Sequence, residues 1–172
     1  MSDVNNPMAE GGGVEALRAE MAALQARLAE ANRLQRIAGR VGRLGGWRVE
    51  LSPPRLIWSP ETAAIHGEPE TIEPTLEQGL AYYAPEFQER IRQVFRRCAK
   101  NGDAFNELAQ ILTAQGQRVW VRSIGEAVRN DAGEIIAVEG AFQDISELVA
   151  ARDAASTLDR RLSQTLENFR TG

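Results

Sequence analysis

Several residue types are scarce in this 172-residue chain, and each scarcity excludes a class of site. Cys98 is the single cysteine and His66 the single histidine, so neither an internal disulfide nor the usual ligand set of a structural zinc site can form. No apolar run approaches the roughly 20 residues that cross a bilayer, and no signal-peptide pattern opens the chain. We therefore expect a cytoplasmic segment, without membrane insertion, that is stabilised by packing.

The charge balance argues against further classes of function. Twenty Lys and Arg face 24 Asp and Glu, which leaves a net charge of −4. Proteins that bind nucleic acid usually carry a clustered basic surplus, so no nucleic-acid partner is expected. No paired carboxylates, Ser/His/Asp set, metal cluster or nucleotide motif stands out. The segment is therefore not expected to be an enzyme, and no catalytic residue or metal ligand is assigned.

Both ends of the chain carry the apolar spacing of a coiled coil. Residues 1–13 are polar and glycine-rich and are predicted to be a disordered tail. Over residues 14–44 apolar side chains recur at intervals of three and four, and the predicted dimerisation seam is Leu17, Met21, Leu24 and Leu28. A second copy of the chain is the simplest partner, in parallel or antiparallel orientation. Residues 146–172 repeat the pattern and predict a C-terminal linker helix that continues into a longer protein.

The segment between these helices, residues 45–145, predicts one compact α+β domain. Strands are expected at 46–51, 55–59, 104–113, 118–129 and 134–145, and helices at 60–66, 75–83 and 85–101. Strand pairs at both ends with helices between them favour a five-stranded antiparallel sheet with its helices on one face. Apolar residues occur in both phases of the last strands, so a flanking helix or a partner chain is expected on the other face.

Three short runs stand out in the second half of the chain: Gln117–Ser123 (QRVWVRS), the turn Asn130–Gly133, and Gly140–Ser146 (GAFQDIS). Together they resemble the C-terminal half of PAS sensor domains, and Asp-Ile-Ser stands where that family usually has Asp-Ile-Thr before the output helix. Earlier matches are Gly46–Trp47, Ile57–Glu61 and Ile65–Gly67. The resemblance implies a five-stranded sheet that cups a small cavity, in a module that relays signals through coiled-coil linkers. Family members occur in histidine kinases, diguanylate cyclases and phosphodiesterases.

The chain also departs from the family's pattern. Ala84-Pro85-Glu86 stands where many PAS domains have His-Pro-Glu/Asp, and Leu108 stands where they often have Glu. Haem-binding relatives place their ligand on the long helix, here 85–101, which has no histidine. Light-sensing relatives place a reactive cysteine in an Asn-Cys-Arg motif that this chain lacks. No cofactor is therefore predicted: haem and flavin are both disfavoured, and a small-molecule ligand stays unidentified.

His66 and Cys98 are instead expected to have local roles. His66 ends a predicted helix, where a partial positive charge is favourable. Cys98 lies near Arg96, Arg97 and Lys100, which could lower its pKa, yet a packed or half-exposed thiol is favoured over a reactive one.

Aromatic and acidic side chains are the candidates for a cavity. The possible lining residues are Trp58, Tyr83, Phe105, Glu107, Trp120 and Phe142. Aromatic residues at strand spacing more often fill a core than line a pocket, and both alternatives stay open. Period-two alternation places Glu107 toward the helices, where an arginine, water or a polar ligand must satisfy it. Otherwise a bulge turns Leu108 inward, and a bulge or a solvated rim is the favoured alternative.

These patterns predict a dimeric PAS sensory or signal-relay module of a bacterial signalling protein. A sensor histidine kinase is the first expectation for the parent protein, with a diguanylate cyclase as another, and a covalently linked effector domain is expected downstream. Asp144, Ser146 and Leu148 are the predicted relay residues at the start of the output helix, with Trp120 and Phe142 packed behind them. The alternative is a structural dimerisation scaffold that binds no ligand.

Overall fold

The computed structural model describes residues 8–171, and it describes side chains for residues 13–158, 160 and 161. The N-terminal helix through Ala38 and the chain from Gly39 onward form two separate units. Helix α1 (Met8–Gly42) begins six residues before the predicted start at Val14, so residues 8–13 are helical rather than part of a tail. Extending an existing helix costs far less than starting a new one, which explains how α1 continues through three glycines.

The predicted seam of α1 lies on the helix surface. Leu17, Met21, Leu24 and Leu28 are between 56% and 63% exposed. Full burial of a large apolar side chain contributes roughly 1.5–3 kcal/mol. The four side chains therefore leave a substantial stabilising contribution available to a partner.

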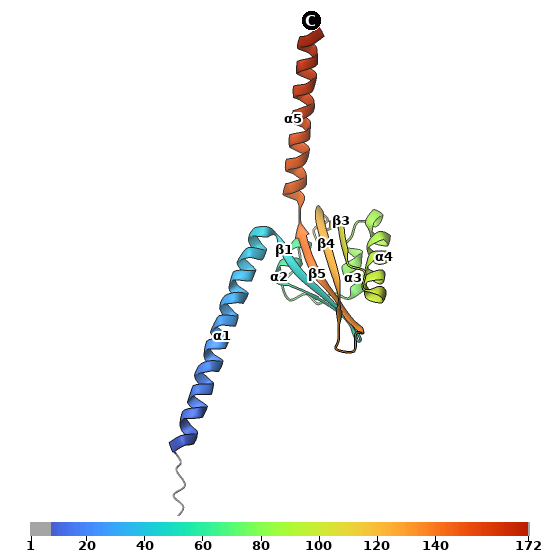
Figure 1. Cartoon of the computed structure of the whole chain (residues 1–172). Helices are drawn as coiled ribbons and strands as arrows, with labels where there is room; N and C mark the ends of the chain where they lie inside the picture. Colours follow the sequence, from blue (N-terminus) through green and yellow to red (C-terminus); the bar gives the residue numbers. More distant parts are fainter. Residues whose placement is uncertain (1–7, 172) are drawn as a thin grey trace, which may run out of the picture. The chain divides into compact units, whose positions relative to one another are not determined.

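Five antiparallel strands form the sheet of the second unit (Figure 1). They are β1 (Leu44–Leu51), β2 (Pro54–Trp58), β3 (Phe105–Leu112), β4 (Arg118–Arg129) and β5 (Ile135–Asp144), in the order β2-β1-β5-β4-β3. The first strand along the chain, β1, thus lies next to the last, β5, and Leu44 pairs with Gln143. The predicted α+β fold with a five-stranded antiparallel sheet is confirmed.

Three helices, α2 (Pro60–His66), α3 (Leu76–Ala81) and α4 (Pro85–Asn101), pack on one face of this sheet (Figure 1). Short-range signals set their ends. The Ser59 hydroxyl accepts a hydrogen bond from the Thr62 amide at the start of α2. Gly67 and Gly102 end α2 and α4 with φ of 75° and 86°, a backbone conformation that favours glycine. Helix α5 (Ser146–Thr171) follows β5 directly.

The core lies between the helices and the inner face of the sheet. Alternate strand residues such as Val49, Ala109, Val121 and Val138 are buried there, against Val94 of α4 and its neighbours. On the outer face, Ile57 and Leu108 remain exposed. What covers this outer face, for which a flanking helix or a partner chain is expected, remains a prediction.

Candidate functional site

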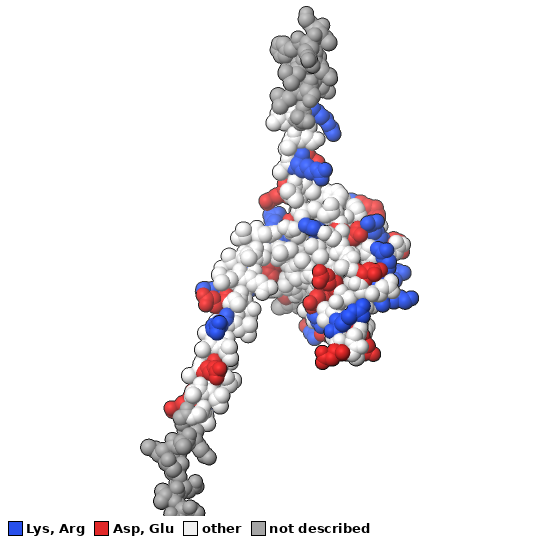
Figure 2. All heavy atoms as spheres, viewed as in Figure 1, with Lys and Arg blue, Asp and Glu red and all other residues white. Residues whose placement is uncertain are grey.

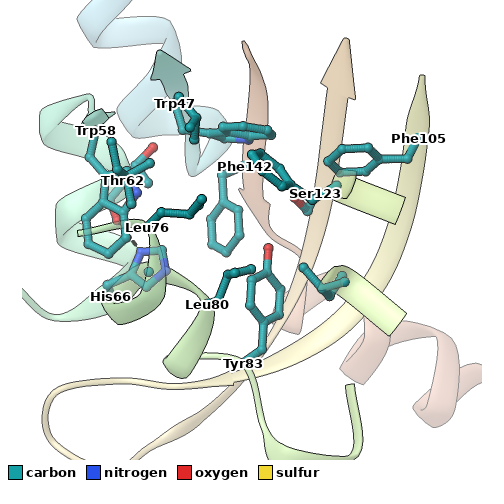
Figure 3. A pocket seen from close by; sticks show the side chains of 15 residues that line it. Trp47, Trp58, Thr62, His66, Leu76, Leu80, Tyr83, Phe105, Ser123 and Phe142 are labelled. Carbon is teal, nitrogen blue, oxygen red and sulfur yellow. Dashed lines mark hydrogen bonds between the residues drawn. The ribbon is translucent and has the colours of Figure 1, made fainter. Parts of the chain in front are cut away.

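A small cavity lies between the inner face of the sheet and helices α2, α3 and α4 (Figure 3). Its volume is about 50 Å³, and its walls include Trp47, Trp58, Leu80, Tyr83, Phe105 and Phe142. One water molecule needs roughly 10–15 Å³, whereas a cavity of about 150 Å³ can hold benzene. As arranged, the space therefore accommodates a few water molecules and no aromatic ligand.

His66 is a fully enclosed polar side chain at this cavity. Its ring stacks between Trp58 and Phe142, with centroids 4.1 Å and 4.8 Å away. Nδ1 lies 2.8 Å from the Thr62 carbonyl oxygen, so Nδ1 carries the proton that it donates. Burial lowers the pKa of His66 to about 4, against the opposing effects of the Thr62 hydrogen bond and the charge of Glu68.

The imidazole of His66 is consequently neutral near pH 7. The sequence-based expectation of a positive charge at the end of α2 is wrong, because the cost of burying the charged ring exceeds the small gain from the helix dipole. A neutral ring that donates through Nδ1 keeps Nε2 as a hydrogen-bond acceptor.

Besides Thr62, two side chains with hydroxyl groups, Tyr83 and Ser123, add polarity to the cavity wall. The side chains of Tyr83 and Ser123 are drawn near each other in Figure 3. Burial raises the pKa of Tyr83 to about 12, while its hydrogen bond with Ser123 acts in the opposite direction. Tyr83 is therefore protonated near neutral pH, and the cavity is a largely apolar space with a few uncharged polar groups.

The structure brings four of the six predicted lining residues together at the cavity. Trp58, Tyr83, Phe105 and Phe142 line it, whereas Glu107 and Trp120 do not. The Trp120 ring packs edge-on against Phe87 instead, at a centroid distance of 6.0 Å.

Glu107 lies in the inward phase of β3, as alternation predicts. The register of β3 with β4 is continuous and Leu108 is 57% exposed, so the favoured bulge that would turn Leu108 inward is wrong. An arginine satisfies the carboxylate: Arg90 Nε and Nη2 of α4 donate to it over 2.6 Å and 3.1 Å. Such a bidentate pair fixes geometry as well as charge.

Sequence reasoning missed other parts of the cavity wall, among them Thr62, His66 and Ser123. Their hydroxyl and imidazole groups carry no apolar signal, and only the pairing of Ser123 with Phe142 across β4 and β5 brings Ser123 to the wall. The one available signal was strand alternation, which places Ser123 in the same phase as buried Val121.

The residues present do not fit haem or flavin. The long helix α4, where haem-binding PAS domains hold their ligand, has no histidine, and the cavity is far smaller than the roughly 300–1,000 Å³ of ligand pockets. Cys98 on α4 is fully buried, and burial, with the nearby charges of Asp103 and Glu126, raises the pKa of its thiol. Of the predicted alternatives, a packed or a half-exposed thiol, the structure has the packed one, and the absence of a reactive role stays a prediction. Within the described residues, no three His, Cys, Asp or Glu side chains gather as metal ligands.

Basic side chains gather on the exposed side of α4 (Figure 2). They are Arg92, Arg96, Arg97 and Lys100, and no described carboxylate lies within ion-pair distance of them. Four charges are fewer than the 6–10 phosphate contacts that make strong nucleic-acid binding. The absence of a nucleic-acid partner stays a prediction.

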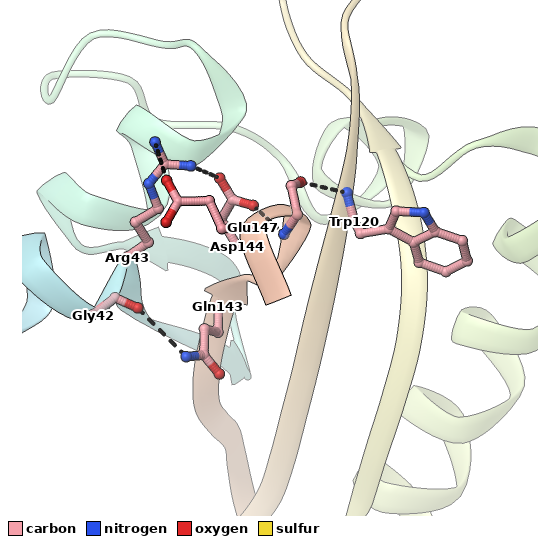
Figure 4. Close-up of polar contacts among 7 residues, drawn as sticks. Gly42, Arg43, Trp120, Gln143, Asp144 and Glu147 are labelled. Atoms are coloured by element: carbon pink, nitrogen blue, oxygen red, sulfur yellow. Dashed lines mark hydrogen bonds and ion pairs between the residues drawn. The ribbon is translucent and has the colours of Figure 1, made fainter. Parts of the chain in front are cut away.

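A second group of polar contacts joins β5 to the start of α5 (Figure 4). The Ser146 amide donates to Asp144 Oδ1 over 2.9 Å, and the Trp120 amide of β4 donates to the Ser146 hydroxyl over 3.1 Å. The Ile145 amide donates to the Trp120 carbonyl over 2.9 Å. Of the predicted relay residues, Asp144 and Ser146 belong to this junction, whereas the Leu148 side chain is 69% exposed and outside it. None of the described helices is long and apolar enough to cross a membrane.

Known proteins resemble this chain in sequence. Sensor protein FixL of Bradyrhizobium diazoefficiens is 23% identical over 126 residues, which are 73% of this chain and 25% of FixL. The probable diguanylate cyclase DgcE of Escherichia coli is 24% identical over 133 residues, or 77% of this chain and 12% of DgcE. The chain therefore spans a quarter or less of the length of these relatives.

Solved structures and a family model agree on the fold. An N-terminal domain of a diguanylate cyclase with PAS/PAC sensor from Marinobacter aquaeolei superposes with a TM-score of 0.56 at 25% identity, covering 60% of this chain and 95% of that one. A sensory box histidine kinase/response regulator from Burkholderia thailandensis gives 0.58 at 21% identity, covering 75% and 97%. The family model described as PAS fold matches residues 55–142, which is more than half of the chain. The chain therefore belongs to the PAS family of sensory domains.

Proposed function

We propose that this chain is a dimeric PAS signal-relay module, in which α1 holds two copies together and α5 carries a conformational change onward. The observation that carries the proposal is the exposed seam of α1, whose large apolar side chains recur at coiled-coil spacing. A second copy offers the same seam and is the simplest partner for it. The N-terminal coiled coil is thus the predicted dimer contact.

The junction between β5 and α5 supports the relay. Asp144 and Ser146 tie the first turn of α5 to the ends of two neighbouring strands, so a shift of the sheet reaches the helix through hydrogen bonds rather than through a loose linker. A signal that favours one of two sheet positions changes the crossing or register of α5. We extend the proposal to a cytoplasmic bacterial signalling protein with a covalently linked effector downstream, a histidine kinase first and a diguanylate cyclase second. The segment itself is proposed to have no catalytic activity.

Substitution in the seam tests the dimer. Leu24→Glu places a charge in the middle of the apolar seam, where burial of an unpaired charge is costly. We expect this variant to be monomeric by light scattering at concentrations where the unmodified chain is dimeric. Ala26→Glu adds the same charge two residues away, outside the seam, and serves as the matched control.

The control should remain a dimer. If the unmodified chain is itself a monomer in dilute solution, or if Leu24→Glu and Ala26→Glu associate equally well, the proposed coiled-coil dimer is wrong. Circular dichroism of both variants checks that the folded domain is retained.

The small cavity favours a second candidate function. With about 50 Å³ of space, the core is filled mainly by its own aromatic side chains. A ligand-free structural dimerisation scaffold needs no more room than this. The two candidates share the dimer and differ in whether a ligand is bound.

A further inference from the structure

Arg43 occupies an unusual backbone position between α1 and β1. Its φ is 46°, in the left-handed region that glycine adopts readily and other residues adopt at a cost. Glycines lie on both sides, at Gly42 and Gly45, yet the residue at this position is an arginine. A residue other than glycine at such a position has a backbone cost, which contacts of its side chain can offset.

The Arg43 guanidinium contacts both sides of the β5–α5 junction (Figure 4). Nη1 donates to Asp144 Oδ2 over 2.8 Å, and Nη2 lies 3.5 Å from Glu147 Oε1 in the first turn of α5. The Asp144 carboxylate is only 13% exposed, and its other oxygen accepts from the Ser146 amide. One arginine therefore holds the residue that ends β5 and a residue that begins α5.

The main chain reinforces these contacts. The Asp144 amide donates to the Arg43 carbonyl over 3.0 Å, and Gln143 Nε2 lies 3.4 Å from the Gly42 carbonyl oxygen. The preceding turn packs closely as well, since a Cβ on Gly39 would lie 2.8 Å from the Leu44 carbonyl oxygen and 3.3 Å from Glu61 Cγ. The last turn of α1 is thus held against the strand end from which α5 starts.

We propose that Arg43 is the residue that couples the end of α1 directly to the first turn of α5. This inference rests on the proposed relay function and specifies its route: a displacement of the last turn of α1 reaches α5 through Arg43, Asp144 and Glu147, without a change in the cavity. Arginine suits the role because its planar fork presents separate nitrogen atoms, Nη1 and Nη2, to the two carboxylates, whereas lysine has a single nitrogen for both.

Residue-resolved amide hydrogen exchange on the whole chain tests the coupling. In Arg43→Gln we expect the amides of Asp144, Ser146 and Val149 to exchange on the order of tenfold faster, because charge-assisted hydrogen bonds are lost at the junction. Arg43→Lys should give a smaller increase. Arg48→Gln is the matched control, since Arg48 pairs with Glu139 on the same sheet, away from α5, and should leave these amides unchanged.

A second substitution separates coupling from a merely structural role. Val41→Gly weakens the exposed last turn of α1 without touching α5. With Arg43 present, Val41→Gly should speed exchange at the Ser146 and Val149 amides; in the Arg43→Gln background it should add nothing. The proposal is overturned if Val41→Gly has the same effect in both backgrounds, or if Arg43→Gln leaves the junction amides unchanged.

These readouts do not depend on the oligomeric state. A monomeric chain that shows the expected exchange pattern contradicts the dimer and leaves the coupling intact. A dimeric chain without the pattern contradicts the coupling alone. Unchanged exchange at the buried amides of Val121 and Val138 shows that the sheet remains folded in every variant.

Discussion

At the scale of single residues, burial of His66 links the stability of the domain to pH. The folded-state pKa of about 4 lies below the ordinary value of 6.5, because burial disfavours the charged ring. Between these two values the unfolded chain binds a proton that the folded chain does not. The contribution of His66 is therefore fully present above pH 6.5 and is lost as the pH falls toward 4. The difference between the two pKa values corresponds to about 3 kcal/mol in the free energy of unfolding.

Urea unfolding at pH 7 and pH 4.5 measures this loss. His66→Gln removes the titrating group, so the variant should lose less stability between the two pH values than the unmodified chain. Carboxylates that titrate in the same range affect both proteins alike and cancel in the comparison. Equal losses in the two proteins would show that the buried imidazole contributes nothing to the acid sensitivity.

The Arg90–Glu107 pair carries a second prediction for single residues. Glu107→Gln removes the charge of a carboxylate that is only 13% exposed and that accepts two hydrogen bonds from Arg90. We therefore expect the midpoint of thermal unfolding to fall by roughly a few degrees. Arg90→Gln on top of Glu107→Gln should cost little more, because the pair is already broken. Glu86→Gln, in the half-exposed pair with Arg118, is the control and should change the midpoint much less. An unchanged midpoint in Glu107→Gln would contradict the importance of the pair.

Residue-level reasoning from sequence succeeded where the cause is local. Alternation gave the inward position of Glu107 as one alternative, although a bulge or a solvated rim was favoured. The partner of Glu107 could not be inferred, because Arg90 lies 17 residues earlier on another element. Arg43 was missed for the same reason: its contact with Asp144 spans 101 residues, and a left-handed backbone at a residue other than glycine has no sequence signal. The charge state of His66 depends on three surrounding rings, which only the fold brings together.

At the scale of elements, the first turn of α5 determines where a proline can interrupt the output helix. Leu148 is the third residue of α5, within the first turn, where a proline is tolerated because the amide lacks a helical partner. The amide of Val149, in contrast, donates to the Ile145 carbonyl over 2.9 Å. Val149 is therefore a better position than Leu148 for a proline that interrupts α5.

We expect Val149→Pro to weaken the start of α5 and Leu148→Pro to have a smaller effect. A proline inside a helix costs about 3 kcal/mol, so Val149→Pro should reduce the helical circular-dichroism signal while the midpoint of the sheet core stays unchanged. If α5 leads into the proposed effector, Val149→Pro should abolish switching in the protein that carries both. Normal switching in that variant would show that the signal does not pass through α5.

The elements themselves were predicted as well as their boundary signals allow. Pro85 at the start and Asn101-Gly102 at the end gave α4 its observed bounds, and Pro60 with Gly67 did the same for α2. Helix α3 is shorter than predicted, since Thr75 is its N-cap and Tyr82 its C-cap. The order of the strands could not be predicted, because the pairing of β1 with β5 joins segments about 90 residues apart and leaves no local pattern.

At the scale of the whole molecule, a bound ligand distinguishes a sensor from a scaffold. Native mass spectrometry of protein purified from its source should show a reproducible extra mass on the dimer if the module senses a small molecule. A dimer of the bare chain favours the scaffold. Visible absorbance of the same sample tests the expectation that neither flavin nor haem is bound, and an absorbance band of either cofactor would contradict it.

The pairing of Leu44 with Gln143 has a further consequence for how the domain is built into longer polypeptides. The main chain comes into the sheet and leaves it at adjacent points on neighbouring strands. A domain whose two attachment points are close together can be inserted, removed or duplicated with little disturbance to the segments on either side. Duplication of such a domain can therefore add a whole copy to a tandem array and leave the spacing of the connecting helices unchanged.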